Sequence, residues 1–291
     1  MKKILMLSGK GGTGKTTLAG AFIHLSEAKA YGDCDVDAPN LHLIMKETAK
    51  GEKETYYGLP KAVISQDACI SCGLCEKNCR FHAISHNPGY SVDPAACEGC
   101  ALCEVLCPAK AIAMEPVPGG EMLLYKDSQH VFSTARLKMG QGTTGLLVSQ
   151  VKKRLDAAAY PDTPLEILDG SPGIGCPVIA SVTGTDLVIL VAEPSLSGIS
   201  DLKRVADTAW KLGVPAALCI NKADASPRHT EAIIHWGKEA GLPFLGTVPY
   251  DPAAIQAVND GKTITEVSCP AGEAARILFK EAMKLLEEPA S

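Results

Sequence analysis

The chain carries, at residues 8–17, a glycine-rich stretch that decides the fold around it: Ser8-Gly9-Lys10-Gly11-Gly12-Thr13-Gly14-Lys15-Thr16-Thr17. A short apolar run, Ile4 to Leu7, precedes the stretch, and a helical pattern from Lys15 to Ala28 follows it. Glycines let consecutive backbone N–H groups point at phosphates, and the positive end of the next helix strengthens the attraction. In such a loop Lys15 is expected to contact the β- and γ-phosphates and Thr16 to ligate Mg²⁺. The stretch predicts a nucleotide site, with a chance glycine-rich turn as the alternative.

Beyond this loop, short apolar runs alternate with helical patterns over most of the chain. The expected strands are 4–7, 165–168, 187–192, 216–220 and 244–248, with a further strand of low strand propensity near 29–32. The expected later helices are 200–212, 227–240 and 272–288. This alternation is typical of the α/β class, with helices on both faces of a doubly wound parallel sheet. Residues 121–150 show no clear pattern apart from a hairpin-like segment at Met122–Tyr125.

Eight of the twelve cysteines fall in two runs of identical spacing, and Pro108 follows the second run. The runs are Cys69, Cys72, Cys75 and Cys79, then Cys97, Cys100, Cys103 and Cys107. This is the thiolate spacing that holds cubane iron–sulfur clusters. Two zinc sites are the alternative, although zinc usually takes pairs of close ligands separated by a longer span. A purely structural role for the clusters, as folding staples, is a second alternative.

The cysteine-rich segment is internally duplicated, because Cys69–Ile84 repeats at Cys97–Ile112 with several matching positions between the cysteines. Such a duplication predicts a compact inserted module, which we place at residues 59–116. Glycine and proline residues mark both of its ends. The nucleotide-binding domain is then discontinuous and consists of residues 1–58 and 117–291.

Composition narrows the class of protein. The 291 residues carry a formal net charge of −5, which provides no basic field for nucleic acid, so we expect no nucleic-acid partner. No long apolar run and no signal-peptide pattern occur, and the closing helix mixes both charges on its polar face, so no stable membrane insertion is expected. We therefore expect a cytoplasmic protein whose cysteines serve as metal ligands rather than in disulfides.

Lys10 narrows the class of nucleotide site further. The pattern Lys-Gly-Gly-Thr-Gly-Lys-Thr resembles that of the signature-lysine P-loop ATPases, the superfamily of MinD, ParA, Mrp-type cluster carriers and the nitrogenase iron protein. In this superfamily the extra lysine crosses a dimer interface to the phosphates of the partner's nucleotide, much as an arginine finger does. The resemblance implies a homodimer in the ATP state, with a solvated loop lysine as the alternative.

Two further segments resemble the same superfamily. The stretch Asp33–Leu41 is similar to the first switch, with Asp35 placed to orient the attacking water, and a generic acidic turn is the alternative for its other aspartates, Asp33 and Asp37. Asp169 is similar to the carboxylate that holds Mg²⁺ through water, and residues 170–175 to the second switch. Both switches are expected to move when the γ-phosphate leaves. The resemblance implies a catalytic set of Lys10, Lys15, Asp35 and Asp169.

The identity of the base is read from two later segments. Asn221-Lys222-Ala223-Asp224 superficially matches the guanine-reading motif of GTPases. In the ATPases resembled here, an asparagine at this strand end contacts adenine, and a loop like Pro249-Tyr250-Asp251 closes over the base. The resemblance favours ATP, bound by the loop 9–17 together with Asn221, Pro249 and Asp251.

The cysteine runs resemble those of bacterial two-cluster ferredoxins, small α+β proteins in which the fourth cysteine of each run serves the other cluster. The resemblance implies one [4Fe-4S] cluster on Cys69, Cys72, Cys75 and Cys107, and a second on Cys97, Cys100, Cys103 and Cys79. Outside the module, Cys176 follows Asp169 at the offset of a cluster-ligating cysteine of the nitrogenase iron protein. It is a candidate ligand for an extra metal at a dimer face, with a buried switch cysteine as the alternative.

Taken whole, the chain resembles MinD-superfamily ATPases that contain an inserted ferredoxin domain. The resemblance implies slow ATP hydrolysis in which nucleotide-dependent dimerisation gates electron transfer through two clusters, toward an unknown redox protein or metalloenzyme client. The expected cofactors are ATP, Mg²⁺ and two [4Fe-4S] clusters. Two alternatives stay open: a metallocentre or iron–sulfur assembly ATPase, and a redox-sensing, MinD-like switch that recruits a partner.

Overall fold

The computed structural model describes residues 1–45 and 50–287, and its main body is a nine-stranded sheet in the order β13-β12-β11-β1-β10-β2-β9-β8-β3. Strands from β13 to β9 run parallel, and β8 and β3 close one edge in antiparallel fashion. The strands are β1 (Lys2–Leu7), β2 (Ala30–Asp33), β3 (Glu52–Tyr57), β8 (Pro118–Lys126), β9 (Val131–Leu137), β10 (Leu165–Asp169), β11 (Leu187–Ala192), β12 (Ala216–Asn221) and β13 (Phe244–Val248). The predicted α/β class is confirmed, and each predicted strand is present, including the one of low strand propensity, β2.

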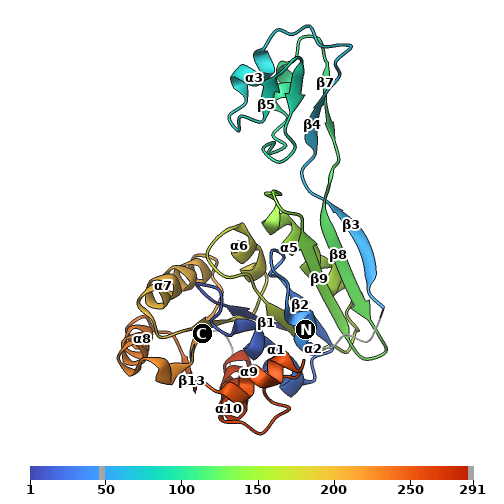
Figure 1. The fold of residues 1–291 in the computed structure, drawn as a ribbon. Helices are drawn as coiled ribbons and strands as arrows, with labels where there is room; N and C mark the ends of the chain where they lie inside the picture. The colour runs from blue at the N-terminus through green and yellow to red at the C-terminus, as the bar shows by residue number, and fades with distance from the viewer. Residues whose placement is uncertain (46–49, 288–291) are drawn as a thin grey trace.

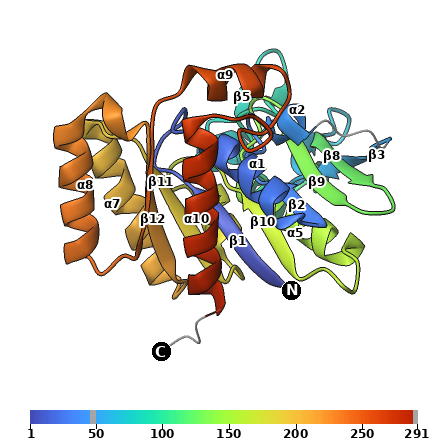
Figure 2. The ribbon, with the colours of Figure 1, turned by 90° about the horizontal axis from the view of Figure 1, so that it is seen from below.

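Helices cover both faces of the sheet (Figure 2). On one face lie α1 (Lys15–Ser26), α2 (Leu41–Met45) and α10 (Pro270–Glu287), and on the other α5 (Thr144–Ala158), α6 (Cys176–Val182), α7 (Leu196–Lys211) and α8 (Pro227–Glu239). The 3-10 turn η1 (Ala223–Ala225) follows β12, and α9 (Pro252–Asn259) follows β13. Successive side chains of β1 enter opposite buried clusters, which explains its unbroken apolar run. No helix in the described ranges is long and apolar enough to cross a membrane.

Two helices begin earlier than predicted. Helix α7 begins at Leu196 rather than at residue 200, because the Ser195 hydroxyl caps it by accepting a hydrogen bond from the Gly198 N–H at 3.1 Å. Helix α10 begins at Pro270 rather than at residue 272, since proline suits a first helical turn. The predicted end of this helix, Glu288, lies outside the described residues.

Residues 121–150 hold a hairpin and a helix that the sequence pattern did not predict beyond Met122–Tyr125. They contain most of β8, all of β9 and the first half of α5. Glycine at position 120 obscures the strand pattern, yet a Cβ there would lie 2.6 Å from the carbonyl oxygen of Arg136 on β9. Glycine is therefore required for the close approach of these two strands.

Residues 61–115 form a small lobe outside the nine-stranded sheet, here called the cysteine lobe (Figure 1). It consists of two antiparallel strand pairs and two short helices: β4 (Lys61–Ile64) with β7 (Ile112–Glu115), β5 (Ile84–His86) with β6 (Tyr90–Val92), α3 (Leu74–Asn78) and α4 (Leu102–Leu106). A separate apolar cluster fills it, built on Ala62, Ala83, Cys97 and Ile112. The chain enters from β3 and returns through β8, which pair with each other in the main sheet.

Glu166, on β10, is fully buried, and its Oε2 lies 3.5 Å from Nζ of Lys3 on β1. Burial, only partly offset by Lys3, raises the pKa of Glu166 to about 7 from the usual 4.5. The folded protein therefore holds a proton that the unfolded chain releases at lower pH. The resulting stabilisation is complete below about pH 4.5 and is lost as the pH rises through about 7. We expect the free energy of unfolding to fall by up to about 3 kcal/mol across this window.

Urea unfolding across this pH range measures the effect. A Glu166→Gln protein, which cannot ionise at this position, is expected to show a flatter pH dependence than the wild type. Glu281→Gln, on the exposed side of α10, removes an equal charge and is expected to keep the wild-type slope. A wild-type slope in Glu166→Gln would contradict the assignment.

Candidate functional site

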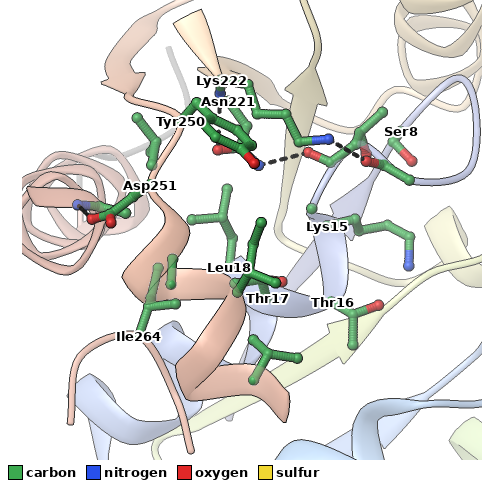
Figure 3. A pocket seen from close by; sticks show the side chains of 18 of the residues that line it. Ser8, Lys15, Thr16, Thr17, Leu18, Asn221, Lys222, Tyr250, Asp251 and Ile264 are labelled. Atoms are coloured by element: carbon green, nitrogen blue, oxygen red, sulfur yellow. Dashed lines mark hydrogen bonds between the residues drawn. The ribbon is translucent and has the colours of Figure 1, made fainter. Parts of the chain in front are cut away.

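The glycine-rich loop borders a cavity of about 400 Å³ at the carboxyl ends of the parallel strands. Figure 3 shows Lys15, Thr16 and Thr17 on one side of it, with Asn221, Lys222 and Tyr250 across from them. Gly14 has φ of +87°, and a Cβ there would lie 2.1 Å from Nδ2 of Asn221, so only glycine fits. Most of the residues predicted to bind nucleotide line this cavity: Gly11, Gly12, Thr13, Gly14, Lys15, Thr16, Thr17, Asn221, Pro249 and Asp251.

Gly9 and Lys10 do not line the cavity. Gly9 packs against α7, where a Cβ would lie 2.3 Å from Cβ of Asp201. The Lys10 ammonium lies 2.7 Å from Oε2 of Glu193 and donates to Oγ of Ser195 at 3.0 Å. A freely solvated loop lysine is therefore ruled out in this structure. Sequence reasoning missed Glu193 and Ser195, although polar residues directly after a buried parallel strand such as β11 are a signal for this edge of the sheet.

Lys15 and Asp169 form a buried ion pair below the cavity. Nζ of Lys15 lies 2.5 Å from Oδ1 of Asp169, and Oγ1 of Thr16 donates to Oδ2 of the same carboxylate at 2.6 Å. Burial favours the neutral amine, but the Asp169 carboxylate outweighs it and raises the pKa of Lys15. The lysine therefore stays charged, and Asp169 occupies both groups that the sequence assigns to phosphate and Mg²⁺.

Asp33 anchors the segment that follows β2. Its side chain is fully buried and accepts backbone N–H groups of Asp35, Asn40 and Leu41 at 2.9–3.0 Å. Burial, with a further contribution from nearby Asp169, raises the pKa of Asp33 to about 7. Asp35 lines the cavity beyond it, and burial, opposed by Lys15, raises the pKa of Asp35 as well. Asp33 therefore fixes the backbone of residues 35–41. The interpretation of Asp33 as part of a generic acidic turn did not predict this role.

The segment after β12 is joined to the glycine-rich loop by two hydrogen bonds. Nδ2 of Asn221 donates to the carbonyl of Thr13 at 2.8 Å, and Nζ of Lys222 donates to that of Gly12 at 3.0 Å. Asp224 accepts the backbone N–H of Tyr250 at 2.6 Å, so it positions the loop 249–251. Asp251 caps α9 through the N–H of Ala253.

Two cavities in the cysteine lobe are lined by cysteines drawn from both runs. One, of about 260 Å³, is bordered by Cys75, Cys79, Cys97, Cys100 and Cys103. The other, of about 20 Å³, is bordered by Cys69, Cys72, Cys75 and Cys107. The fourth cysteine of each run thus lies beside the first three of the other run. All twelve cysteines are free.

The cysteine side chains do not converge on a common centre that could hold a single metal ion. Within residues 1–45 and 50–287, no group of three or more His, Cys, Asp or Glu side chains is close enough to hold a single metal ion. A mononuclear zinc site needs four ligands at about 2.0–2.3 Å from one centre. In the described residues the cysteines therefore border two cavities without forming a preformed site for a metal ion of any kind.

The remaining cysteines differ in exposure. Cys34 and Cys219 are fully buried, and burial raises the pKa of each thiol to about 12. Cys269 is also buried. Cys176, the first residue of α6, is exposed. The reading of Cys176 as a buried switch cysteine is therefore wrong, because the turn 170–175 ends at the surface.

Comparisons with known proteins agree with this geometry. The family model described as the CobQ/CobB/MinD/ParA nucleotide binding domain matches residues 4–264. An uncharacterized protein of Methanocaldococcus jannaschii is 34% identical over 225 residues, which are 76% of this chain and 78% of that protein. A homolog of the cytosolic Fe-S cluster assembly factor NUBP2 from Trichoplax adhaerens is 25% identical over 134 residues, 41% of this chain and 51% of that protein.

A solved structure shares the fold. The septum site-determining protein MinD of Pyrococcus horikoshii, complexed with Mg-ADP, has a TM-score of 0.56 and 17% identity, and the match covers 98% of this chain and 97% of that one. At this identity the likeness concerns the fold alone. Since the family model spans most of the sequence, the chain belongs to the CobQ/CobB/MinD/ParA family of nucleotide-binding domains.

Proposed function

We propose that this protein is a cytoplasmic ATP-hydrolysing iron–sulfur protein, in which nucleotide-dependent homodimerisation gates electron transfer through two [4Fe-4S] clusters. Residues 59–116 serve as an inserted ferredoxin-type domain, and residues 1–58 and 117–291 as the ATPase domain. The proposal rests on one observation: two cavities lined by cysteines of both runs occur in a chain that also carries a complete phosphate-binding loop.

The donor set in the cysteine lobe fits two cubane clusters. Cys69, Cys72, Cys75 and Cys107 would hold one, and Cys97, Cys100, Cys103 and Cys79 the other. The two fourth cysteines are held alike: the N–H of Ala83 donates to Sγ of Cys79 at 3.4 Å, and that of Ala111 to Sγ of Cys107 at 3.3 Å. Such hydrogen bonds orient sulfur ligands and make reduction easier. The clusters, when bound, supply one-electron transfer.

The nucleotide cavity fits ATP and Mg²⁺. Oγ1 of Thr13 is buried there without a hydrogen-bond partner among the described residues, so it is available to a ligand. In the ATP-bound protein, phosphate oxygens would replace the Asp169 carboxylate as the partner of the Lys15 ammonium. The Thr16 hydroxyl and Asp169 would then be available to hold Mg²⁺, which would supply charge stabilisation at the phosphates, and Asp35 would orient the attacking water. Lys10 reaches the partner's nucleotide in the dimer.

A series of close contacts connects the end of residues 170–175, the segment that resembles the second switch, to the cysteine lobe. Gly145, at the start of α5, packs so closely on Cys176 that a Cβ would lie 3.0 Å from its Cβ, and a Cβ at Gly142 would lie 3.0 Å from Oε2 of Glu98 in the lobe. The buried ammonium of Lys152 on α5 donates to three carbonyls, those of Ala180, Ser181 and Thr183, at the end of α6. Figure 1 shows the loop between β9 and α5 pointing toward the lobe. A displacement of α6 would therefore reach the wall of the larger cysteine cavity.

Anaerobic electron transfer tests the proposal. Reconstituted protein is reduced with dithionite, and its oxidation by a viologen acceptor of low driving force is followed with and without MgATP. We expect MgATP to change the rate by about tenfold or more, which corresponds to about 1.4 kcal/mol in the barrier. An equal rate under both conditions would contradict gating by nucleotide.

Tyr56 offers a narrower test of the route through the β9–α5 loop. Its buried hydroxyl donates to the carbonyl and to Oγ1 of Thr143, at 3.2 and 2.9 Å. We expect Tyr56→Phe to lower the free energy of unfolding by about 1 kcal/mol and to reduce the MgATP effect on electron transfer, because the loop loses its attachment to β3. Tyr57→Phe, at a half-exposed position, is the matched control. Lost stability with an unchanged MgATP effect would remove Tyr56 from the route.

A second candidate function is the assembly of metallocentres. It is favoured by the partial similarity to an Fe-S cluster assembly factor homolog, together with the exposed position of Cys176 beside the second switch. We expect such a protein to transfer iron to an apo-acceptor and to hold more than about eight iron atoms per chain in its ATP-bound dimer. Iron analysis of Cys176→Ala checks this, since the excess iron should disappear. A wild-type dimer without excess iron would leave electron delivery as the stronger function.

A further inference from the structure

Glu193 binds two lysines with one carboxylate. It follows β11 directly, and its Oε2 lies 2.7 Å from Nζ of Lys10 while its Oε1 lies 3.0 Å from Nζ of Lys222. Burial alone would raise the pKa of Glu193, but hydrogen bonds from the two lysines outweigh it and lower the pKa. Glu193 is therefore ionised at neutral pH and carries a negative charge beside the glycine-rich loop.

Two acceptors fix the position of the Lys10 ammonium. Besides Glu193, it contacts Oγ of Ser195, which itself accepts the Gly198 N–H and caps α7. Lys222 donates both to Glu193 and to the Gly12 carbonyl. Glu193 is therefore connected to the glycine-rich loop at two points, directly at Lys10 and through Lys222 at Gly12. Lys10 does not line the nucleotide cavity, and its ammonium contacts Glu193 and Ser195 instead.

The Lys10–Glu193 ion pair can form in the resting protein and can still be replaced by a phosphate group. The Lys10 and Glu193 side chains are 30% and 22% exposed, so solvent screens their attraction. A triphosphate carries more charge than a carboxylate and offers several oxygens, so it can displace Glu193 from the ammonium. The Glu193 charge also repels any phosphate that approaches Lys10 from outside the chain.

We propose that Glu193 is a positioning residue that withholds Lys10 from the partner's triphosphate and thereby sets the ATP concentration at which the dimer forms. This inference rests on the proposed function, in which Lys10 acts across the dimer. Dimerisation requires Lys10 to exchange the Glu193 carboxylate for phosphate oxygens, so the strength of the resting pair enters the equilibrium.

The test uses the full chain reconstituted under anaerobic conditions. Sedimentation velocity gives the dimer fraction as MgATP is raised, and a fluorescent ATP analogue gives the affinity of the monomer at low protein concentration. We expect Glu193→Gln to dimerise at a three- to ten-fold lower MgATP concentration, roughly the worth of one exposed ion pair. Asp207→Asn breaks an ion pair with Lys211 on α7 at equal change in charge and is expected to behave as wild type.

A double-mutant cycle separates positioning from a general structural effect. Since dimerisation depends on Lys10, the measurable quantity in a Lys10→Ala background is the affinity of the monomer for the ATP analogue, and Glu193→Gln is expected to leave this affinity unchanged. Ser195→Ala removes the other acceptor of Lys10 and is expected to shift the threshold in the same direction, which keeps the test valid if Glu193→Gln does not fold.

The outcomes are distinct. A wild-type chain that stays monomeric in saturating MgATP contradicts the proposed dimerisation itself. A wild-type chain that dimerises, with Glu193→Gln unchanged or requiring more MgATP, contradicts only the role of Glu193. A change in the ATP affinity of the monomer that Glu193→Gln causes even without Lys10 would assign the effect to Lys222 and the Gly12 carbonyl instead, and would overturn the inference.

Discussion

Lys15→Ala is expected to lower the rate of ATP hydrolysis by at least about 100-fold, the typical cost of removing one preorganised charge or donor from a reacting centre. Lys15 is nearly fully buried, lies at the first residue of α1 and lines the cavity, so its removal takes away the ammonium expected to contact the phosphates. Single-turnover phosphate release at saturating ATP measures the loss. Lys211→Ala, at an exposed ion pair on α7, is the matched control and should keep the wild-type rate.

The same substitution also tests the buried ion pair. Without Lys15, the Asp169 carboxylate remains buried near Asp33 with no cation beside it, and we expect the free energy of unfolding to fall by about 3–5 kcal/mol. Lys15→Ala combined with Asp169→Asn should recover much of this stability but none of the hydrolysis. A double variant that hydrolyses ATP at half the wild-type rate or faster would remove both residues from the catalytic set.

Cys79→Ser is expected to remove one cluster and leave the other, so the iron content falls from about eight to about four atoms per chain. The reason is the crossed arrangement of the cavities, in which Cys79 lies with Cys97, Cys100 and Cys103, and Cys107 lies with the first run. Iron analysis and EPR of the reduced protein under anaerobic conditions measure the loss. Cys176→Ser, outside the lobe, is the control and should retain both clusters.

Pairs of substitutions decide between crossed and sequential ligation. Cys69→Ser with Cys107→Ser should cost a single cluster, because both residues border the smaller cavity. Cys69→Ser with Cys79→Ser should cost both clusters, although the two residues belong to one run. The opposite pattern would show that each run holds its own cluster.

Local patterns predicted most of the main sheet. Strands such as β1, β11 and β12 are buried on both faces, so they appear in the sequence as unbroken apolar runs of strand length. Strand β2, expected near residues 29–32, has little strand propensity of its own, since it reads Ala30-Tyr31-Gly32-Asp33. Its four residues are all buried, and pairing with β10 and β9 stabilises it. Tertiary context here outweighs propensity.

The edge of the sheet was not predictable in the same way. Strand β8 includes Gly120, which the close approach of β9 requires, and β3 reads Glu-Lys-Glu-Thr-Tyr-Tyr, with only Tyr56 buried. An exposed edge strand needs no apolar alternation, so its pattern is weak. Helix α7 begins four residues before its predicted start, because Ser195, three residues after the end of β11, caps it.

The sequence by itself determined the phosphate-binding loop, the parallel α/β class and the two cysteine runs, because each depends on spacing within a short segment. Only the tertiary structure decided which distant groups meet: Lys15 with Asp169, Lys10 with Glu193, and the β9–α5 loop with the cysteine lobe. Those contacts depend on strand order, which sets β10 and β11 on either side of β1. Strand order is a property of the packed sheet, in which residues far apart along the chain share one edge, so no local spacing encodes it.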